Sequence, residues 1–451
     1  MKKLYAPWEK TFQKVATPLE HFIHAQTTTG IVLIFMTIIA LILANSPLYD
    51  YYYDVFHLKI SFNVSDWKLS HTIHHWINDG LMAIFFFLIG LEIKRNILVG
   101  ELSNIRVAIL PILAALGGMV VPALIYVFIN SGLPSQNGWG IPMATDIAFA
   151  ISALVLLQKR VSPSLVTFLI ALAIVDDLGA VVVIATFYTE QIHLVPLALA
   201  GGSFLIMVMF NRFGIHTVLP YFLVGMFLWF FMLESGVHAT IAGVIAAMAI
   251  PSKPKFIPSD FTHHIQNNLD EYDNYPVATD YSLHEKQKAI LINISEKVDS
   301  VQSPSARLEQ VLHLPVSLLV IPLFALANAG ISINFTQVDE ALLKPISFGI
   351  ILGLVLGKVL GIAGVSYIAT KLKIAQLPDN SSMSQVFGVS LLGGIGFTMS
   401  IFVAELAFYG NASYIFQAKI GILTASLLAG LGGYLWLRFI AQKPHPDQNG
   451  N

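Results

Sequence analysis

Two adjacent aspartates, Asp176 and Asp177, lie in the middle of the otherwise apolar segment TFLIALAIVDDLGAVVVIATFY at residues 167–188. A charged side chain at the centre of a membrane costs about 2.5 to 3.5 kcal/mol on insertion scales, so one that is present indicates a function. Two carboxylates can take up protons, and their oxygens are also the ligands that small hard cations such as Na⁺ and Li⁺ prefer. Because a proton and a cation would compete for the same oxygens, the pair predicts ion/proton exchange.

Two further ionisable residues, Asp146 and Lys358, also fall inside apolar segments. One lysine cannot neutralise two adjacent acids, and successive residues of a helix point about 100° apart. One aspartate could therefore meet Lys358 while the other faces a water-filled cavity. The alternative is that some of these charges pair with one another as buried structural ion pairs.

The composition places these charges in a membrane protein. The chain has 451 residues, of which 55% are hydrophobic and 12% are charged, and a soluble protein has roughly twice that charged fraction. Its formal net charge of −2 argues against a nucleic-acid partner, because no basic field attracts phosphates. The absence of cysteine excludes disulfides, thiolate metal sites and cysteine nucleophiles, and no cofactor is expected.

Apolar runs of about 18 to 25 residues recur along the chain, each long enough to cross a bilayer. They are continuous rather than alternating, so they predict an all-α integral membrane protein and not a barrel. About twelve spans are expected, near residues 28–45, 72–96, 105–130, 139–158, 163–188, 194–211, 217–233, 236–250, 312–331, 345–370, 384–408 and 415–441.

Lysine and arginine residues mark the cytoplasmic side of a membrane protein when they gather in short loops. On one side the loops hold Lys2, Lys3, Lys10, Lys14, Lys94, Arg95, Arg106, Lys159, Arg160, Arg212, Lys371, Lys373, Arg438 and Lys443. On the other side they hold Lys59, Lys68, Lys344 and Lys419. Both termini are therefore predicted to be cytoplasmic, as segments 1–27 and 442–451.

Two polar segments separate the predicted spans. Residues 46–71 contain HLKISFNV, whose partial alternation predicts an exterior hairpin. Residues 251–311 form a long cytoplasmic loop between a first block of spans at 28–250 and a second at 312–441. Within this loop, Ser282 and Glu285 match a capping box, which predicts one amphipathic helix after a polar stretch.

Two of the predicted spans contain helix-breaking residues. GWGIPMATDIAFAISALVLL carries Asp146 beside Gly140, Pro142 and Thr145, and SQVFGVSLLGGIGFTMSIFVAEL contains three closely spaced glycines. Interrupted spans in opposing halves of a chain are typical of transporters built from inverted repeats. If the breaks cross, like ends of half-helices meet, and Asp146 could offset two N-termini while Lys358 offsets two C-termini.

Several segments together resemble the NhaA-type sodium/proton antiporters. They are MATDIAFAISAL, LAIVDDLGAVVVIA, ESGVHATIAGV, IPLFALANAG, GLVLGKVLGI and LLGGIGFTMSIFVAEL, and the resemblance extends from about residue 20 to 440. It implies an inverted-repeat membrane fold with two interrupted, crossing helices and a location in the bacterial inner membrane. It also implies exchange of two protons for one Na⁺ or Li⁺ by alternating access, activation at alkaline pH, and a homodimer with the hairpin at its interface.

The same resemblance implies roles for individual residues. Asp177 with Asp176 would bind the cation and the protons, Thr145 and Asp146 would lie at the helix break, and Lys358 would pair with an acid or balance the helix ends. The residues that it implicates in the pH response are Glu92, Arg95, His238, Glu309 and His313, for which ordinary polar residues at helix ends are the alternative interpretation.

Two substitutions and the length of the loop depart from the family pattern. This chain has Asn96 where the family usually has Glu, and Ala306 where it often has Lys. The loop at 251–311 is also longer than usual. All three departures fall near the expected sensing region.

Three other functions remain to be weighed. His71, His74 and His75, with Asp79, have a spacing that could bind a transition metal, although interfacial histidines are the more ordinary interpretation. An intramembrane aspartyl protease would need GxGD and YD motifs within spans, and the spans contain neither. A cation channel would have rings of like groups along a pore rather than one charge cluster. The sequence thus favours a transporter over an enzyme, and it leaves transport of K⁺ open.

Overall fold

The computed structural model describes residues 26–64, 67–157, 160–189, 192–255, 258–275, 283–332 and 335–441. The chain divides into two compact units. Unit 1 comprises residues 1–85, 96–190 and 314–451, and unit 2 comprises residues 86–95 and 191–313. Residues 1–25 and 442–451 fall outside the described residues, so most of the predicted N-terminal segment and all of the predicted C-terminal segment are among those not described.

The N-terminal part of unit 1 begins with α2 (Gln26–Ala44), which is followed by α3 (Tyr49–His57). The predicted hairpin is confirmed: β1 (Lys59–Val64) pairs antiparallel with β2 (Trp67–Thr72). A Thr72 side chain caps the short helix α4 (Ile73–His75) by accepting a hydrogen bond from the backbone N–H of His75. The chain then continues through the π-helical segment η1 (Trp76–Leu81) into α5 (Met82–Leu98).

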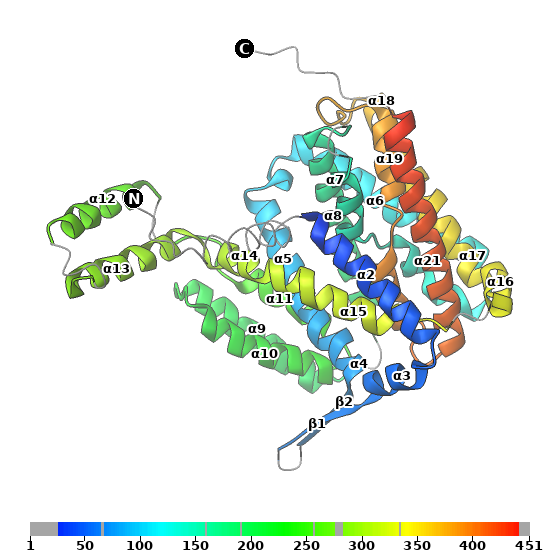
Figure 1. Ribbon diagram of the computed structural model, residues 1–451, viewed down its shortest axis with the longest axis horizontal. Coiled ribbons are helices and arrows are strands. Elements are labelled where there is room, and N and C mark those ends of the chain that lie inside the picture. Colours follow the sequence, from blue (N-terminus) through cyan, green and yellow to red (C-terminus); the bar gives the residue numbers. More distant parts are fainter. Residues whose placement is uncertain are drawn as a thin grey trace, which may run out of the picture. The chain divides into compact units, whose positions relative to one another are not determined.

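The first interrupted span lies between two long helices. α6 (Ile105–Ile129) precedes the 3₁₀ helix η3 (Pro134–Met143), which is followed by α7 (Ile147–Val155) and α8 (Pro163–Phe187). Ser162 accepts a hydrogen bond from the backbone N–H of Leu165, and Pro163 occupies the first helical position, so the local sequence fixes where α8 starts. α6 packs along α8 (Figure 1), and this places the acid-bearing helix against a fixed neighbour.

The C-terminal part of unit 1 contains the second interrupted span. Its elements are η4 (Val316–Val320), α15 (Ile321–Asn328), α16 (Phe335–Leu343), α17 (Pro345–Leu352), η5 (Gly353–Gly357), η6 (Val359–Gly364), α18 (Val365–Lys371), α19 (Met383–Leu392), α20 (Phe397–Ala407), α21 (Ala412–Leu435) and η7 (Trp436–Ile440). A short 3₁₀ helix, η2 (Glu101–Ser103), lies in the earlier part of the unit, between α5 and α6. α19 and α20 are bent by 49° at their break. α21 packs along both α17 and α19.

A close backbone contact joins α6 to η6. A Cβ atom placed on Gly117 would lie 2.3 Å from the carbonyl oxygen of Gly361, and one on Gly361 would lie 2.2 Å from the carbonyl oxygen of Gly117. Side chains at either position would therefore separate the two elements. The contact holds the segment that carries Lys358 directly against α6.

Unit 2 contains the middle of α5 together with α9 (Leu194–Arg212), α10 (Val218–Glu234), α11 (Thr240–Ala249), α12 (Pro258–Asp273), α13 (Glu285–Val301) and most of α14 (Pro304–Pro315). α9 and α10 form an antiparallel pair, and Gly214 at the turn between them has a φ of 73°, which favours glycine.

The predicted loop at 251–311 contains the packed helices α12 and α13 and also the start of α14, whereas one helix was predicted there. α13 confirms the predicted amphipathic helix, whereas α12 lies in the stretch that was expected to be without a helix. The predicted capping residue Ser282 falls outside the described residues. His284 occupies the N-cap of α13 instead, and it forms a capping box with Gln287.

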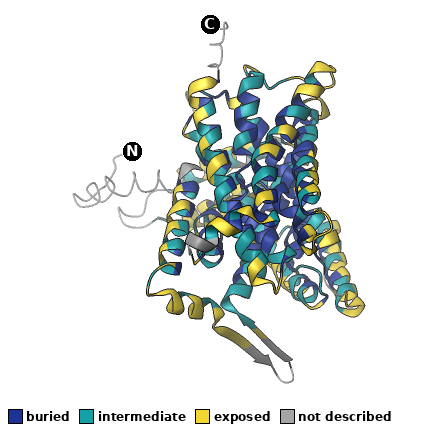
Figure 2. Ribbon diagram, turned by 90° about the vertical axis from the view of Figure 1, so that its right-hand side faces the viewer, coloured by how far each residue is buried: buried dark blue, intermediate teal, exposed yellow. Residues whose placement is uncertain are grey.

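The all-α membrane fold is confirmed for the described residues, in which β1 and β2 are the strands. Seven helices there are long and apolar enough to cross a membrane, and nine if each of two bent pairs counts as one span. Twelve spans remain a prediction, because shorter elements such as α11, at ten residues, do not reach across a bilayer by themselves. In Figure 2 many helices bury one side and expose the other, as expected for helices that face both a packed interior and lipid.

Candidate ion site

Lys358 lies at the centre of the site and is completely buried. Its Nζ atom lies 2.9 Å from Asp176 Oδ2 and donates hydrogen bonds to Thr145 Oγ1, at 2.9 Å, and to the carbonyl oxygen of Met143. The lysine stands between the π-helical segments η5 and η6, and such local widening of a helix frequently marks functional positions. Burial of the ammonium is thus matched by three oxygen acceptors.

The acid pair lies on α8, and each of the two residues is about 2% exposed. Asp176 forms the ion pair with Lys358, which answers a question that the sequence left open. Its second oxygen, Oδ1, is buried and has no hydrogen-bond partner among the described residues. Asp177 is the next residue of the same helix and so points in another direction. The site therefore contains one acid that is neutralised by a lysine and a second acid beside it.

Asp146 occupies the first helix break and contacts both interrupted spans. Its Oδ1 atom accepts a hydrogen bond of 3.2 Å from the backbone N–H of Phe149 and so caps α7. Its Oδ2 atom accepts hydrogen bonds from the backbone N–H and from the hydroxyl of Thr398, in the first turn of α20. One carboxylate thus serves two helix N-termini, where negative charge is favourable.

The two breaks are also joined through the backbone. The N–H of Asp146 donates to the carbonyl oxygen of Ile395 at 2.6 Å, and the Thr145 hydroxyl donates to the carbonyl oxygen of Gly393 at 2.9 Å. Gly393 ends α19, and Met143 ends η3, so the other two half-helix ends are C-terminal. Lys358 contacts the end of η3 and Thr145 contacts the end of α19. The crossing of two interrupted helices that the sequence predicted is therefore present.

Glycines in the second break allow this close approach. A Cβ atom on Gly394 would lie 2.3 Å from the carbonyl oxygen of Leu354, and one on Gly396 would lie 3.1 Å from the carbonyl oxygen of Ala144, in the first break. Any larger residue would push α19 and α20 away from the lysine segment and from the first break. The glycine spacing in the sequence is thus explained by packing at the crossing.

Two hydroxyl residues at this crossing were missed by the sequence analysis. Thr398 contacts Asp146, and Ser400 Oγ donates to the carbonyl oxygen of Ile141 at 2.8 Å. Both follow the glycine-rich break within one helical turn. A hydroxyl immediately after a break is the signal that could have identified them, because helix N-termini attract polar side chains.

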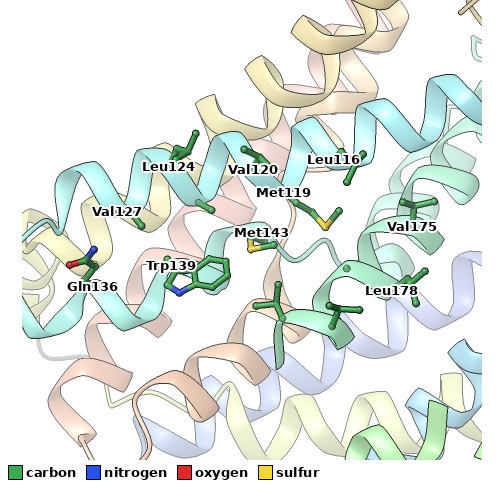
Figure 3. A pocket seen from close by; sticks show the side chains of 14 residues that line it. Leu116, Met119, Val120, Leu124, Val127, Gln136, Trp139, Met143, Val175 and Leu178 are labelled. Carbon is green, nitrogen blue, oxygen red and sulfur yellow. The ribbon is translucent and has the colours of Figure 1, made fainter. Parts of the chain in front are cut away.

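An apolar pocket of about 720 Å³ lies between α6, η3 and α8 (Figure 3). Its lining includes Met119, Trp139, Met143 and Val175, and most of the other side chains that line it are aliphatic. Neither aspartate of α8 lines this pocket, so it is not the water-filled cavity predicted beside the acid pair. Its lining instead includes Met143 and Val175, which are next to the polar site, so the pocket adjoins the site on an apolar side.

Unit 2 brings together three of the five residues predicted for the pH response. Arg95 Nε lies 3.1 Å from Glu309 Oε1, and the charges of both residues act on Glu92. His313 lies one turn beyond Glu309 on α14, and His238 lies in the turn between α10 and α11. Of the two substitutions that depart from the family pattern, Asn96 is buried and Ala306 is exposed. Arg95 and Glu309 are thus a real ion pair, while a common role for all five residues remains a prediction.

The histidine cluster that could have bound a transition metal has other contacts. His75 Nδ1 lies 3.1 Å from Asp79 Oδ2, His71 stacks on the His75 ring, and His74 Nε2 lies 2.9 Å from Asn328 Oδ1. Among the residues that the structure describes, no group of three or more His, Cys, Asp or Glu side chains is arranged to hold a metal ion. These histidines thus have polar and stacking partners within the chain, and their interfacial position remains a prediction.

Comparison with known proteins decides the family. A family model described as "Na⁺/H⁺ antiporter 1" matches residues 20–437. The chain belongs to this antiporter family. Among its relatives, the Na⁺/H⁺ antiporter NhaA of Sulfurimonas denitrificans is 69% identical, over 98% of this chain and 99% of its own length. The Na⁺/H⁺ antiporter NhaA 1 of Saccharophagus degradans is 48% identical, over 95% of this chain and 93% of its own.

Family membership has two further consequences. The family consists of transporters, so the expectation that the chain is not an enzyme is confirmed and the protease alternative is removed. Together with the apolar helices, the family also makes the chain a multi-pass bacterial membrane protein. The resemblance inferred from the sequence motifs is confirmed over nearly the same residues, 20–437.

Proposed function

We propose that this protein exchanges Na⁺ or Li⁺ for H⁺ across the membrane by alternating access, with Asp176 and Asp177 as the ion-binding pair. The observation that carries the proposal is the arrangement of charges on α8. Asp176 is paired with the buried Lys358 at 2.9 Å, and Asp177, the next residue of α8, is buried beside it. The site has carboxylate oxygens for a cation and acids for protons in one place.

The charges of the site suggest a stoichiometry. When both acids are protonated and Lys358 is charged, the three side chains carry a net charge of +1. When both acids are ionised and hold one Na⁺, the same side chains and the ion carry zero. Return of the protonated form and transport of the loaded form then move two protons against one cation, so each cycle moves one net charge.

Coupling follows because the proton and the cation bind to the same carboxylate oxygens. A cation needs ionised carboxylates as ligands, whereas protonation removes those ligands. Lys358 contributes a fixed positive charge that disfavours a cation unless both acids are ionised. Binding of the cation therefore requires release of the protons, which is the condition for exchange rather than for independent leakage.

The crossing of the interrupted helices supports alternating access at this site. Asp146 offsets two N-termini and Lys358 with Thr145 satisfies two C-terminal ends, so the breaks stay stable inside the protein. A short half-helix can then move while its broken end remains satisfied. A cation channel is the alternative, and it would show Na⁺ flux without obligatory proton movement.

The remaining assignments belong to the same proposal. The protein would be a homodimer in the bacterial inner membrane, in contact with lipid, with both termini cytoplasmic and the hairpin of β1 and β2 at the dimer interface. Glu92, Arg95, His238, Glu309 and His313 would set its dependence on pH. The Arg95–Glu309 ion pair supports a link between α5 and α14 for that response.

Everted membrane vesicles provide the test. An acid-inside pH gradient is formed, Na⁺ or Li⁺ is added, and a pH-sensitive dye reports proton efflux. We expect the cation to dissipate the gradient with the wild-type chain and not with Asp177→Asn, whereas Asn96→Glu should retain exchange. If a variant that lacks both acids of α8 still exchanges, the proposal is wrong; Na⁺ flux without proton movement would favour the channel.

A further inference from the structure

The half-span η3 is an unusual element to find next to an ion site. It is a 3₁₀ helix of ten residues, whereas runs of this helix beyond three or four residues are uncommon because its hydrogen bonds have poor geometry. Its weak internal bonding raises the question of what keeps it in one position. The answer bears on the site, because η3 ends at Met143, whose carbonyl oxygen accepts a hydrogen bond from Lys358.

Side-chain hydroxyls from three neighbouring helices hold η3. The Tyr126 hydroxyl, on α6, donates to the carbonyl oxygen of Ser135 at 2.9 Å. Ser400, on α20, reaches Ile141. The Tyr188 hydroxyl makes two contacts, because it accepts from the backbone N–H of Gly140 at 3.0 Å and donates to the carbonyl oxygen of Asn137 at 2.9 Å.

Tyr188 occupies a distinctive place among these contacts. It is the C-cap residue of α8, the helix that carries both aspartates of the site. Its ring is buried, and a Cβ atom on Gly140 would lie 2.6 Å from its hydroxyl, so only glycine permits this approach. One hydroxyl therefore connects the end of the acid-bearing helix to the middle of the half-span that supplies Met143.

We propose that Tyr188 is a positioning residue for ion binding: its hydroxyl fixes η3 relative to α8 so that Met143 and Thr145 share Lys358 with Asp176. This inference rests on the proposed exchange at the acid pair. With η3 in place, the ammonium divides its three N–H donors among two neutral oxygens and one carboxylate. If η3 shifts, the ammonium loses neutral acceptors and interacts more strongly with Asp176. A cation must then compete with a tighter ion pair, so its apparent affinity falls.

The test uses the full chain, purified and reconstituted into liposomes, with Na⁺-dependent proton movement measured over a range of Na⁺ concentrations. Tyr188→Phe removes one hydroxyl and keeps the ring. The matched control is Tyr409→Phe, since Tyr409 is 79% exposed. We expect Tyr188→Phe to raise the KM for Na⁺ about tenfold, as loss of two neutral hydrogen bonds allows, with the rate at saturating Na⁺ within about twofold of wild type. The control should match wild type.

A merely structural role would give a different result. It would lower the amount of folded protein or the saturating rate and leave the KM for Na⁺ unchanged, and that outcome would overturn the inference. Hydrogen–deuterium exchange adds an independent readout, because the Gly140 amide should exchange faster in Tyr188→Phe than in Tyr409→Phe. Equal exchange in the two variants would also overturn it.

Two further measurements distinguish a failure of the role of Tyr188 from a failure of the proposed function. If Tyr188→Phe does not fold, Tyr126→Phe releases the other end of η3, and a KM equal to that of Tyr409→Phe would then contradict the inference. If the wild-type chain shows no Na⁺/H⁺ exchange at all, the proposed function fails. If the wild type exchanges ions and the tyrosine variants share its KM, only the role of Tyr188 fails.

Discussion

Two ion pairs of this protein have the same chemistry and very different surroundings. The Lys358–Asp176 pair in unit 1 is 0% and 1% exposed, whereas the Arg95–Glu309 pair in unit 2 is 53% and 16% exposed. Removing one partner of a buried pair leaves an uncompensated charge and typically costs about 3 to 5 kcal/mol, but exposed pairs contribute about 0 to 1 kcal/mol. The first pair is therefore suited to holding a transport site together, and the second to a response that can be changed at small cost.

Lys358→Met should have the largest effect and tests the buried pair directly, because it keeps the length of the side chain and removes its charge. The variant strands Asp176, so we expect a loss of about 3 to 5 kcal/mol in the free energy of unfolding, seen as a lower Tm of the purified protein in detergent. The loss should be smaller at acid pH, where a protonated Asp176 costs less to bury.

The matched double variant Lys358→Met with Asp176→Asn removes both charges and should recover much of the lost stability. If the single and double variants melt at the same temperature, the buried pair is not what stabilises the crossing of the interrupted helices.

Asp146→Asn should have the next largest effect. Asparagine can still cap α7, but it lacks the negative charge that α7 and α20 share, and it accepts less strongly from Thr398. We expect a loss of about 1 to 3 kcal/mol in stability, with a clear fall in Na⁺-dependent exchange in vesicles. Unchanged folding and transport would show that the crossing does not need this charge.

Thr398→Val tests one hydrogen bond of the same crossing. It removes the hydroxyl that donates to Asp146 and preserves the shape of the side chain, so about 1 kcal/mol of stability should be lost. Thr186→Val is the control, because the Thr186 hydroxyl bonds within its own helix and is exposed. Equal melting temperatures for the two variants would argue against a role for Thr398.

Glu309→Gln should have the smallest effect and so sharpens the contrast between the pairs. It removes the carboxylate that faces Arg95, and we expect less than about 1 kcal/mol of lost stability with the maximal exchange rate within about twofold of wild type. The measurement is exchange in vesicles across a range of pH. A shift of the pH profile would support the sensing role of α14, whereas loss of exchange at every pH would place Glu309 in the transport site itself.

The central charges of the site could be predicted from the sequence because they contradict their surroundings. Asp146, Asp176 and Lys358 are conspicuous in apolar segments, where an ionised group is costly. The breaks were visible as glycine and proline within spans. These features are local, so a single sequence contains them.

The partners of these charges could not be predicted in the same way. Which aspartate meets Lys358 depends on the rotation of α8 against η5 and η6, and no local pattern encodes it. Hydroxyls such as those of Thr398 and Tyr188 are ordinary within membrane helices, so their types carry little signal. The helix α12 did carry a signal in the sequence, because the apolar residues Phe261, Ile265 and Leu269 recur every four residues. This apolar stripe is narrow and lies in a polar segment, so the signal is weak.

The glycine contact between α6 and η6 has a consequence for how such a protein can move. With the backbones of Gly117 and Gly361 touching, neither element can turn about its own axis without a collision. Any step that presents Lys358 to the opposite side of the bilayer must carry α6 along as a single rigid body. The flexible joints of the transport cycle should therefore be sought at the chain breaks near residues 144–146 and 393–396, and not along this paired core.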